Sequence, residues 1–251
     1  MSTCLIACSA RIAVVIESMT FIGQKERQMR RTAVIVGALF WISNLATVVG
    51  SVISGPIPDA PNSLTIMYPH GTQVLVGTLI AHINDAAIIG YAVVLFPVLK
   101  RFSESLALGY VAFKLLEATM LVVSAAILLS MIALSQNYIT AGASAASSFQ
   151  AVAEVTLAQQ FWASRLAALA YLFATPILNF LLYRSQLVPR FISVWGFIAL
   201  AMLAIGLAIG VGDPTRGFEP GQLLVVPIIL WELFFATWLI VRGFNPSAVA
   251  A

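Results

Sequence analysis

Six long apolar segments, separated by short polar stretches, constrain the fold of this chain more than any other feature. They lie at about residues 32–54, 73–98, 106–134, 157–182, 190–211 and 221–241. Each is long enough to cross the hydrocarbon core of a bilayer, which takes about 20 helical residues. Bacterial membrane strands are about 9–11 residues of alternating character, whereas these segments are unbroken apolar runs. The sequence therefore predicts an all-α fold, a polytopic membrane helix bundle with six transmembrane helices.

Composition leads to the same conclusion. Of the 251 residues, 61% are hydrophobic and 9% are charged, whereas soluble domains carry roughly 25% charged residues. The formal net charge is only +3, and the basic residues sit in short clusters between apolar segments, as they do in the loops of membrane proteins. These features exclude a soluble globular domain and argue against nucleic acid as a partner. The bilayer itself is the expected partner.

The distribution of lysine and arginine predicts the topology. Nine basic residues fall on one side of the six spans, and Arg216 is alone on the other side. The nine are Lys25, Arg27, Arg30, Arg31, Lys100, Arg101, Arg184, Arg190 and Arg242. Because basic loops stay in the cytoplasm, both termini are predicted to be cytoplasmic.

The ends and loops complete the expected organisation. Residues 1–25 are apolar but interrupted by Arg11 and Glu17, so they form either an N-terminal extension with an interfacial helix or a segment upstream of a misplaced start codon. The six-helix transmembrane domain covers 26–246, and a short cytoplasmic tail covers 247–251. The outer loop at 135–156, rich in Ala, Ser and Gly, has room for a short amphipathic helix.

Ionisable residues inside the spans are the candidates for function. An ionised side chain at the bilayer centre costs about 2.5–3.5 kcal/mol on insertion scales, so such residues face the bundle interior and compensate one another. The predicted buried polar cluster consists of Asp85, Glu117, Glu232, Lys114, Arg165 and His82.

Helical spacing supports a shared cluster. Thr78, His82 and Asp85 follow one another at i, i+4 and i+7 and form one polar stripe along the second span. Lys114 and Glu117 are an i, i+3 pair on the third span. Asn44 on the first span and Asn179 on the fourth are further polar positions within the apolar segments.

Three interpretations of the cluster remain open. The three acids and two cations sum to −1 if all are ionised. A buried carboxylate without a cation takes up a proton, so one of the three acids is a candidate proton carrier. On this interpretation the protein binds or transports a proton, an ion or a small polar solute. Alternatively, the charges only hold helices together in a structural or regulatory membrane subunit. A third reading, an intramembrane enzyme, has less support, because none of the common hydrolase, metalloprotease or phosphate-binding motifs occurs.

No cofactor or metal site is expected. His82 is the only histidine within a span, so a haem with two histidine ligands or a histidine-rich zinc site would lack ligands. Cys4 and Cys8 are the only cysteines and lie in the first ten residues, so no thiolate site can be built across the fold.

Three stretches carry a family resemblance. They are LFPVLKRFSESLALGYVAFKLLEA at 95–118, LLYRSQLVPRFISVWGFI at 181–198 and ELFFATWLIVRGFNP at 232–246. The chain resembles, from about Arg30 to Asn245, the bacterial integral-membrane family called domain of unknown function 4386. The resemblance implies a multi-span protein of the bacterial inner membrane and matches Glu117 and Glu232 to acidic positions of the family. It implies no activity, and protein partners stay open.

Overall fold

The computed structural model describes residues 2–58, 60, 62–141, 146–209, 220–245 and 248, with the backbone alone for 2–22 and 220–222. All regular structure in these residues is helical: α1 (Ser2–Ser54), α2 (Ser63–Ile66), α3 (Gly71–Ala81), α4 (Ile83–Leu99), α5 (Glu104–Ala141), α6 (Ala146–Ser185), α7 (Arg190–Ile209), the short 3-10 helix η2 (Pro220–Val225) and α8 (Val226–Val241). Arg216 and most of the tail 247–251 lie outside the described residues.

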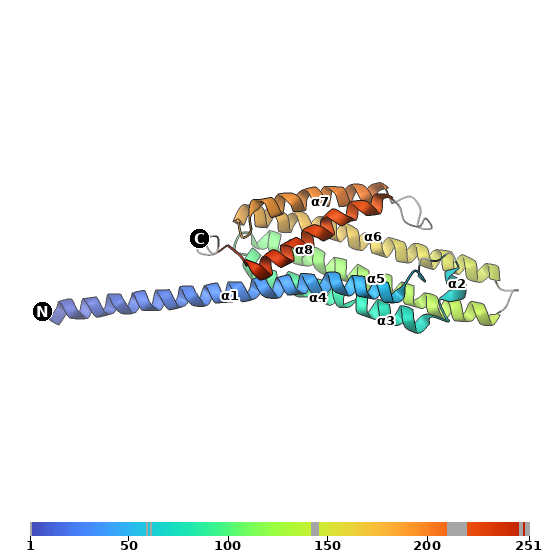
Figure 1. Cartoon of the computed structure of the whole chain (residues 1–251), viewed down its shortest axis with the longest axis horizontal. Coiled ribbons are helices and arrows are strands. Elements are labelled where there is room, and N and C mark those ends of the chain that lie inside the picture. The colour runs from blue at the N-terminus through green and yellow to red at the C-terminus, as the bar shows by residue number, and fades with distance from the viewer. Residues whose placement is uncertain are drawn as a thin grey trace.

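Six helical stretches are long and apolar enough to cross a membrane, as predicted: Gly23–Ser54, Gly71–Leu99, Glu104–Ala141, Ala146–Ser185, Arg190–Ile209 and Leu223–Val241. The predicted fold class, a six-span all-α bundle, is therefore confirmed, and the protein is a multi-pass membrane protein. The helix α1 has 53 residues and is about 80 Å long at 1.5 Å per residue. Its N-terminal part continues past the end of the bundle (Figure 1).

The connection between the third and fourth spans differs from the prediction. Most of residues 135–156, expected to be a loop with a short helix of its own, instead extend the spans: α5 continues to Ala141 and α6 begins at Ala146. Alanine and glutamine in this stretch favour helix, and a helix that has left the membrane has no physical reason to end at the boundary. The two helices form a long hairpin that reaches beyond α7 and α8 (Figure 1).

The helices form a closed ring. α1 packs against α4, α4 against α5, α5 against α6, α6 against α7, α7 against α8, and α8 against α1 again. The turn between α4 and α5, the turn between α6 and α7, and the C-terminal end of α8 lie at one end of the bundle, here called the basic end because Lys100, Arg101, Arg184, Arg190 and Arg242 lie there.

Small residues let α1 and α3 approach closely. A Cβ atom added to Gly50 would lie 2.5 Å from the carbonyl oxygen of Gly77 and 2.6 Å from the backbone nitrogen of Ala81. Helices in lipid gain stability from such close packing, because apolar side chains have no water to avoid there. The α1–α3 contact therefore depends on residues without large side chains.

The C-terminal end of α8 is closed by an arginine from the other end of the chain. Arg30 on α1 donates from Nη1 to the carbonyl oxygen of Leu239 at 3.1 Å, and from Nη2 to those of Ile240 at 2.7 Å and Val241 at 3.2 Å. Gly243, with φ +74°, ends the helix, and its N–H donates to the oxygen of Leu239 at 3.1 Å. The last carbonyl groups of a helix have no partner within it, and here Arg30 supplies several of the missing donors.

Candidate functional site

A group of polar side chains from five helices meets inside the ring. The helix α5 contributes three residues, and α1, α4, α6 and α8 contribute one each; we call the group the central cluster. Its members are Asn44, Tyr91, Tyr110, Lys114, Glu117, Tyr171 and Glu232.

Lys114 and Glu117 form a closed ion pair on α5. The ammonium Nζ donates to Oε2 of Glu117 at 2.8 Å, and the two residues are 2% and 6% exposed. The pair joins residues at i and i+3, so one helix places both groups on one face. Charges this deeply buried are held in place by each other, because neither has water to solvate it.

Glu232 on α8 has a different kind of partner. The phenol of Tyr171 on α6 donates to its Oε1 at 2.8 Å, and the side-chain amide of Asn44 on α1 donates to its Oε2 at 3.2 Å. Both carboxylate oxygens thus accept a hydrogen bond from a neutral group. This arrangement ties together three helices that are distant in sequence.

Tyr171 connects the ion pair with Glu232. Its ring centroid lies 4.3 Å from Nζ of Lys114, and the Tyr91 ring lies 5.4 Å from the same nitrogen. An ammonium over an aromatic face is attracted by the ring quadrupole. The Lys114 ammonium therefore forms the ion pair with Glu117 and also contacts the ring of Tyr171, whose hydroxyl donates to Glu232.

Tyr110 lies one turn before Lys114, on the same face of α5. It is fully buried, and its hydroxyl has no hydrogen-bond partner among the described residues. Buried hydroxyl groups nearly always have a partner, so this one is an exception that calls for an explanation. Tyr110, Lys114 and Glu117 together form a polar stripe at i, i+4 and i+7.

His82 and Asp85 form a second polar group, in the second span. Nδ1 of His82 is hydrogen bonded to Oδ2 of Asp85, Asn84 donates to the other carboxylate oxygen at 3.3 Å, and Ser43 on α1 donates to the side-chain oxygen of Asn84. The span, expected to be one continuous helix, is interrupted here: α3 ends at Ala81 and α4 begins at Ile83. His82 lies at the break, where the N–H of Asp85 bonds its carbonyl oxygen.

Arg165 lies on α6 and contacts an aromatic ring of its own helix. Its guanidinium lies 4.8 Å from the ring centroid of Phe161 on its own helix, α6. The nearby Ser124 of α5 accepts a hydrogen bond from the Gln160 amide at 3.2 Å. The six residues proposed from the sequence thus fall into a central group with Lys114, Glu117 and Glu232, a second with His82 and Asp85, and Arg165.

The sequence interpretation missed the three tyrosines of the central cluster. Tyr91 and Tyr171 lie well inside apolar segments, away from the membrane boundaries where tyrosine is usually enriched, whereas Tyr110 lies about one turn inside the segment 106–134. That position is a usable signal, because a phenol hydroxyl buried in a span requires a hydrogen-bond partner. Within the described part of the chain, no group of three or more His, Cys, Asp or Glu residues could hold a metal ion.

Comparison with known proteins gives a family and nothing more specific. The model of the family described as Domain of unknown function (DUF4386) matches residues 35–243. No curated protein and no solved structure matches the chain. The family match covers most of the sequence and includes every residue of the central cluster, the His82–Asp85 pair and Arg165. The chain therefore belongs to the DUF4386 family.

Proposed function

We propose that this protein transports a proton or small cation, alone or together with a small polar solute, and that Glu232 is the residue that binds it. The observation that carries the proposal is the difference in partners within the central cluster. Lys114 forms an ion pair with Glu117, whereas the two groups that hydrogen bond Glu232 are neutral. Two carboxylates share one ammonium, so a proton or a monovalent cation at Glu232 would neutralise the cluster.

The contacts suggest how occupancy of Glu232 would reach other helices. A proton on Oε1 would make this oxygen a weaker acceptor for Tyr171, whose ring also lies against Lys114. Asn44 would lose part of its attraction to the opposite oxygen. Binding at α8 would therefore loosen contacts with α1 and α6, which is the kind of change that a transport cycle requires.

The His82–Asp85 pair supports the same proposal. An imidazole nitrogen can accept or donate a proton, and that of His82 is hydrogen bonded to a buried carboxylate at a break in a spanning helix. Interrupted helices at mid-membrane depth are common places for ion sites in transporters. We assign the pair as a second position where a proton can reside.

The alternative function is a structural or regulatory membrane subunit. The closed Lys114–Glu117 pair favours it, because an ion pair without access to water is suited to fixing helices and not to exchanging ions. In this case Glu232 also serves only to join α1, α6 and α8.

Proton flux into vesicles separates the two functions. Purified protein is reconstituted with a pH-sensitive dye inside the vesicles, and a pH gradient is imposed. We expect wild-type protein to collapse the gradient faster than empty vesicles do, and Glu232→Gln to fall to the empty-vesicle rate while its thermal unfolding stays close to wild type. The matched control is Glu104→Gln, the same change at an exposed residue that begins α5.

Two outcomes of this experiment would contradict the proposal. If wild-type protein collapses neither a proton gradient nor a monovalent-cation gradient faster than empty vesicles do, the result favours the structural alternative. Glu232→Gln transporting as fast as Glu104→Gln removes Glu232 from the path.

We also propose that the protein lies in the bacterial inner membrane with the basic end in the cytoplasm. The support is the clustering of arginine and lysine at that end of the bundle, since basic loops are retained in the cytoplasm. Reporter fusions after Asn245 and within the turn at 100–103 should read cytoplasmic, and a fusion at residue 62 should read periplasmic. A periplasmic signal after Asn245 would reverse the orientation.

A further inference from the structure

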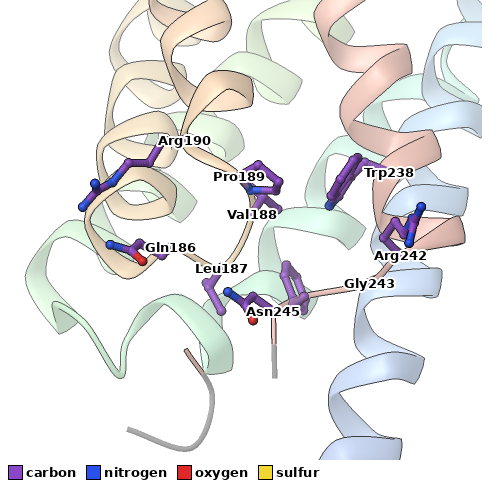
Figure 2. Close-up of a pocket in the computed structure, with 10 residues that line it drawn as sticks. Gln186, Leu187, Val188, Pro189, Arg190, Trp238, Arg242, Gly243 and Asn245 are labelled. Carbon is purple, nitrogen blue, oxygen red and sulfur yellow. The ribbon is translucent and has the colours of Figure 1, made fainter. Parts of the chain in front are cut away.

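A pocket of about 300 Å³ opens at the basic end of the bundle. One wall is the turn 186–190 between α6 and α7, and the other is the segment 238–245 at the end of α8 (Figure 2). The two walls are joined at the base, because the N–H of Asn245 donates to the carbonyl oxygen of Leu187 at 2.8 Å. This backbone hydrogen bond fixes the two walls relative to each other at that point.

The charge of the pocket is positive. Arg242 lies on the α8 wall beside Trp238, and Arg190 begins α7 on the opposite wall, where its guanidinium is 5.3 Å from the Tyr183 ring (Figure 2). No acidic residue lines the pocket, and neither arginine forms an ion pair within the described part of the chain. The α7 N-terminus at the same place adds partial positive charge. An anion is the complementary ligand.

An apolar surface continues from the pocket along the spans. Trp238, which lines the pocket, stacks with Phe234 at a centroid distance of 6.3 Å and contacts Phe191 edge-on at 6.2 Å. Phe234 also packs against Trp195 at 5.4 Å. Phe191 is 52% exposed and Phe234 is 37% exposed. This aromatic face, formed by Phe191, Trp195, Phe234 and Trp238, lies on segments that span the membrane, so lipid chains are its natural neighbours.

The arginines of the pocket and the aromatic face together indicate the class of ligand. A free phosphate ion would use the arginines but not the aromatic face, and a neutral lipid would use the face but not the arginines. We propose that the pocket binds the phosphate headgroup of an anionic phospholipid, whose acyl chains lie along the aromatic face of α7 and α8. The volume is at the lower end of small-molecule sites, which suits a phosphate ester with the chains left outside.

Lipid binding to the purified full chain in neutral detergent tests the assignment. The probes are phosphatidylglycerol, phosphatidylcholine and inorganic phosphate, and the readouts are native mass spectrometry and the shift in thermal unfolding. We expect phosphatidylglycerol to bind and stabilise more strongly than the other two. Arg242→Gln should weaken phosphatidylglycerol binding about tenfold or more, the size expected for losing one charge-assisted hydrogen bond.

The matched control is Arg184→Gln, an exposed arginine near the end of α6 that does not line the pocket. It should bind phosphatidylglycerol within about twofold of wild type, since a screened surface charge contributes little. Phe191→Ala should weaken the binding of phosphatidylglycerol and leave the shift in thermal unfolding caused by inorganic phosphate unchanged. Equal losses for Arg242→Gln and Arg184→Gln, equal binding of phosphatidylcholine, or equal stabilisation by inorganic phosphate would each overturn the assignment.

Discussion

Two carboxylates in the bundle interior, those of Glu117 and Glu232, differ in the groups that bind them. Glu117 is 6% exposed and paired with a lysine on its own helix, whereas Glu232 is partly buried and bonded by a tyrosine and an asparagine from two other helices. The first carboxylate can lose its charge only if the charge of Lys114 is left uncompensated. The second can take up a proton at the expense of hydrogen bonds alone. In the proposed function, the partner of each carboxylate is what distinguishes the structural acid, Glu117, from the exchangeable acid, Glu232.

Removing the cation of the closed pair should have the largest effect. Lys114→Met leaves Glu117 buried without a counter-charge, and breaking a buried pair from one side typically costs about 3–5 kcal/mol. We expect a large fall in thermal stability of the purified protein in detergent, measured by tryptophan fluorescence.

The control is the double variant Lys114→Met with Glu117→Gln, which removes both charges. It should recover most of the lost stability, because no uncompensated charge remains. A double variant no more stable than Lys114→Met would show that the pair is not what holds these charges in the interior, and the contrast with Glu232 would fail.

Arg30 offers a cation that contributes to stability from outside the interior. Arg30→Met removes three hydrogen bonds to the end of α8, and hydrogen bonds to charged groups contribute about 1.5–3 kcal/mol each. Because the site is partly open to solvent, we expect a total loss of about 2–3 kcal/mol. Arg31→Met, at the exposed next position of α1, should change stability by less than about 0.5 kcal/mol.

We expect Arg30→Met to lower thermal stability and to leave proton flux per folded molecule unchanged. Loss of flux with unchanged stability would instead place the α1–α8 junction in the transport path.

The sequence predicted the parts of this architecture that depend on a single helix. Six spans follow from length and apolarity, and Lys114 with Glu117 follows from i, i+3 spacing. Tyr110 could have been found in the same way, since it lies four residues before Lys114. Tyrosine counts as an apolar residue in the prediction of spans, so apolarity alone does not distinguish the three tyrosine positions of the central cluster from their neighbours.

The contacts between helices could not be predicted in this way. Asn44 and Glu232 are both polar positions within apolar segments, but they are 188 positions apart in the sequence, and no periodicity connects them. The same holds for Arg30 and the carbonyl groups of α8, and for the pocket at the basic end. These features depend on how the ring closes, which is set by packing between faces that look alike in sequence.

Tyr171 tests the neutral half of the comparison. Tyr171→Phe keeps the ring against Lys114 but removes the hydrogen bond to Glu232. A hydrogen bond to a charged group contributes about 1.5–3 kcal/mol, so thermal stability should fall by an amount in the lower part of that range. In a Glu232→Gln background the loss caused by Tyr171→Phe should be smaller, because the hydrogen bond that is removed is then to a neutral amide and not to a carboxylate. Additive losses would mean that the two side chains act independently.

Tyr110 should give the smallest effect, and its sign is informative. Tyr110→Phe makes the same chemical change as Tyr171→Phe, at a phenol that is fully buried and has no partner among the described residues. Since no hydrogen bond is lost and an unsatisfied buried group is removed, stability should stay the same or rise by up to about 1 kcal/mol. A loss as large as that of Tyr171→Phe would show that the Tyr110 hydroxyl is bonded in the membrane. A gain in stability accompanied by slower proton flux would mean that this phenol is kept at an energetic disadvantage because it lies on the path of the transported proton.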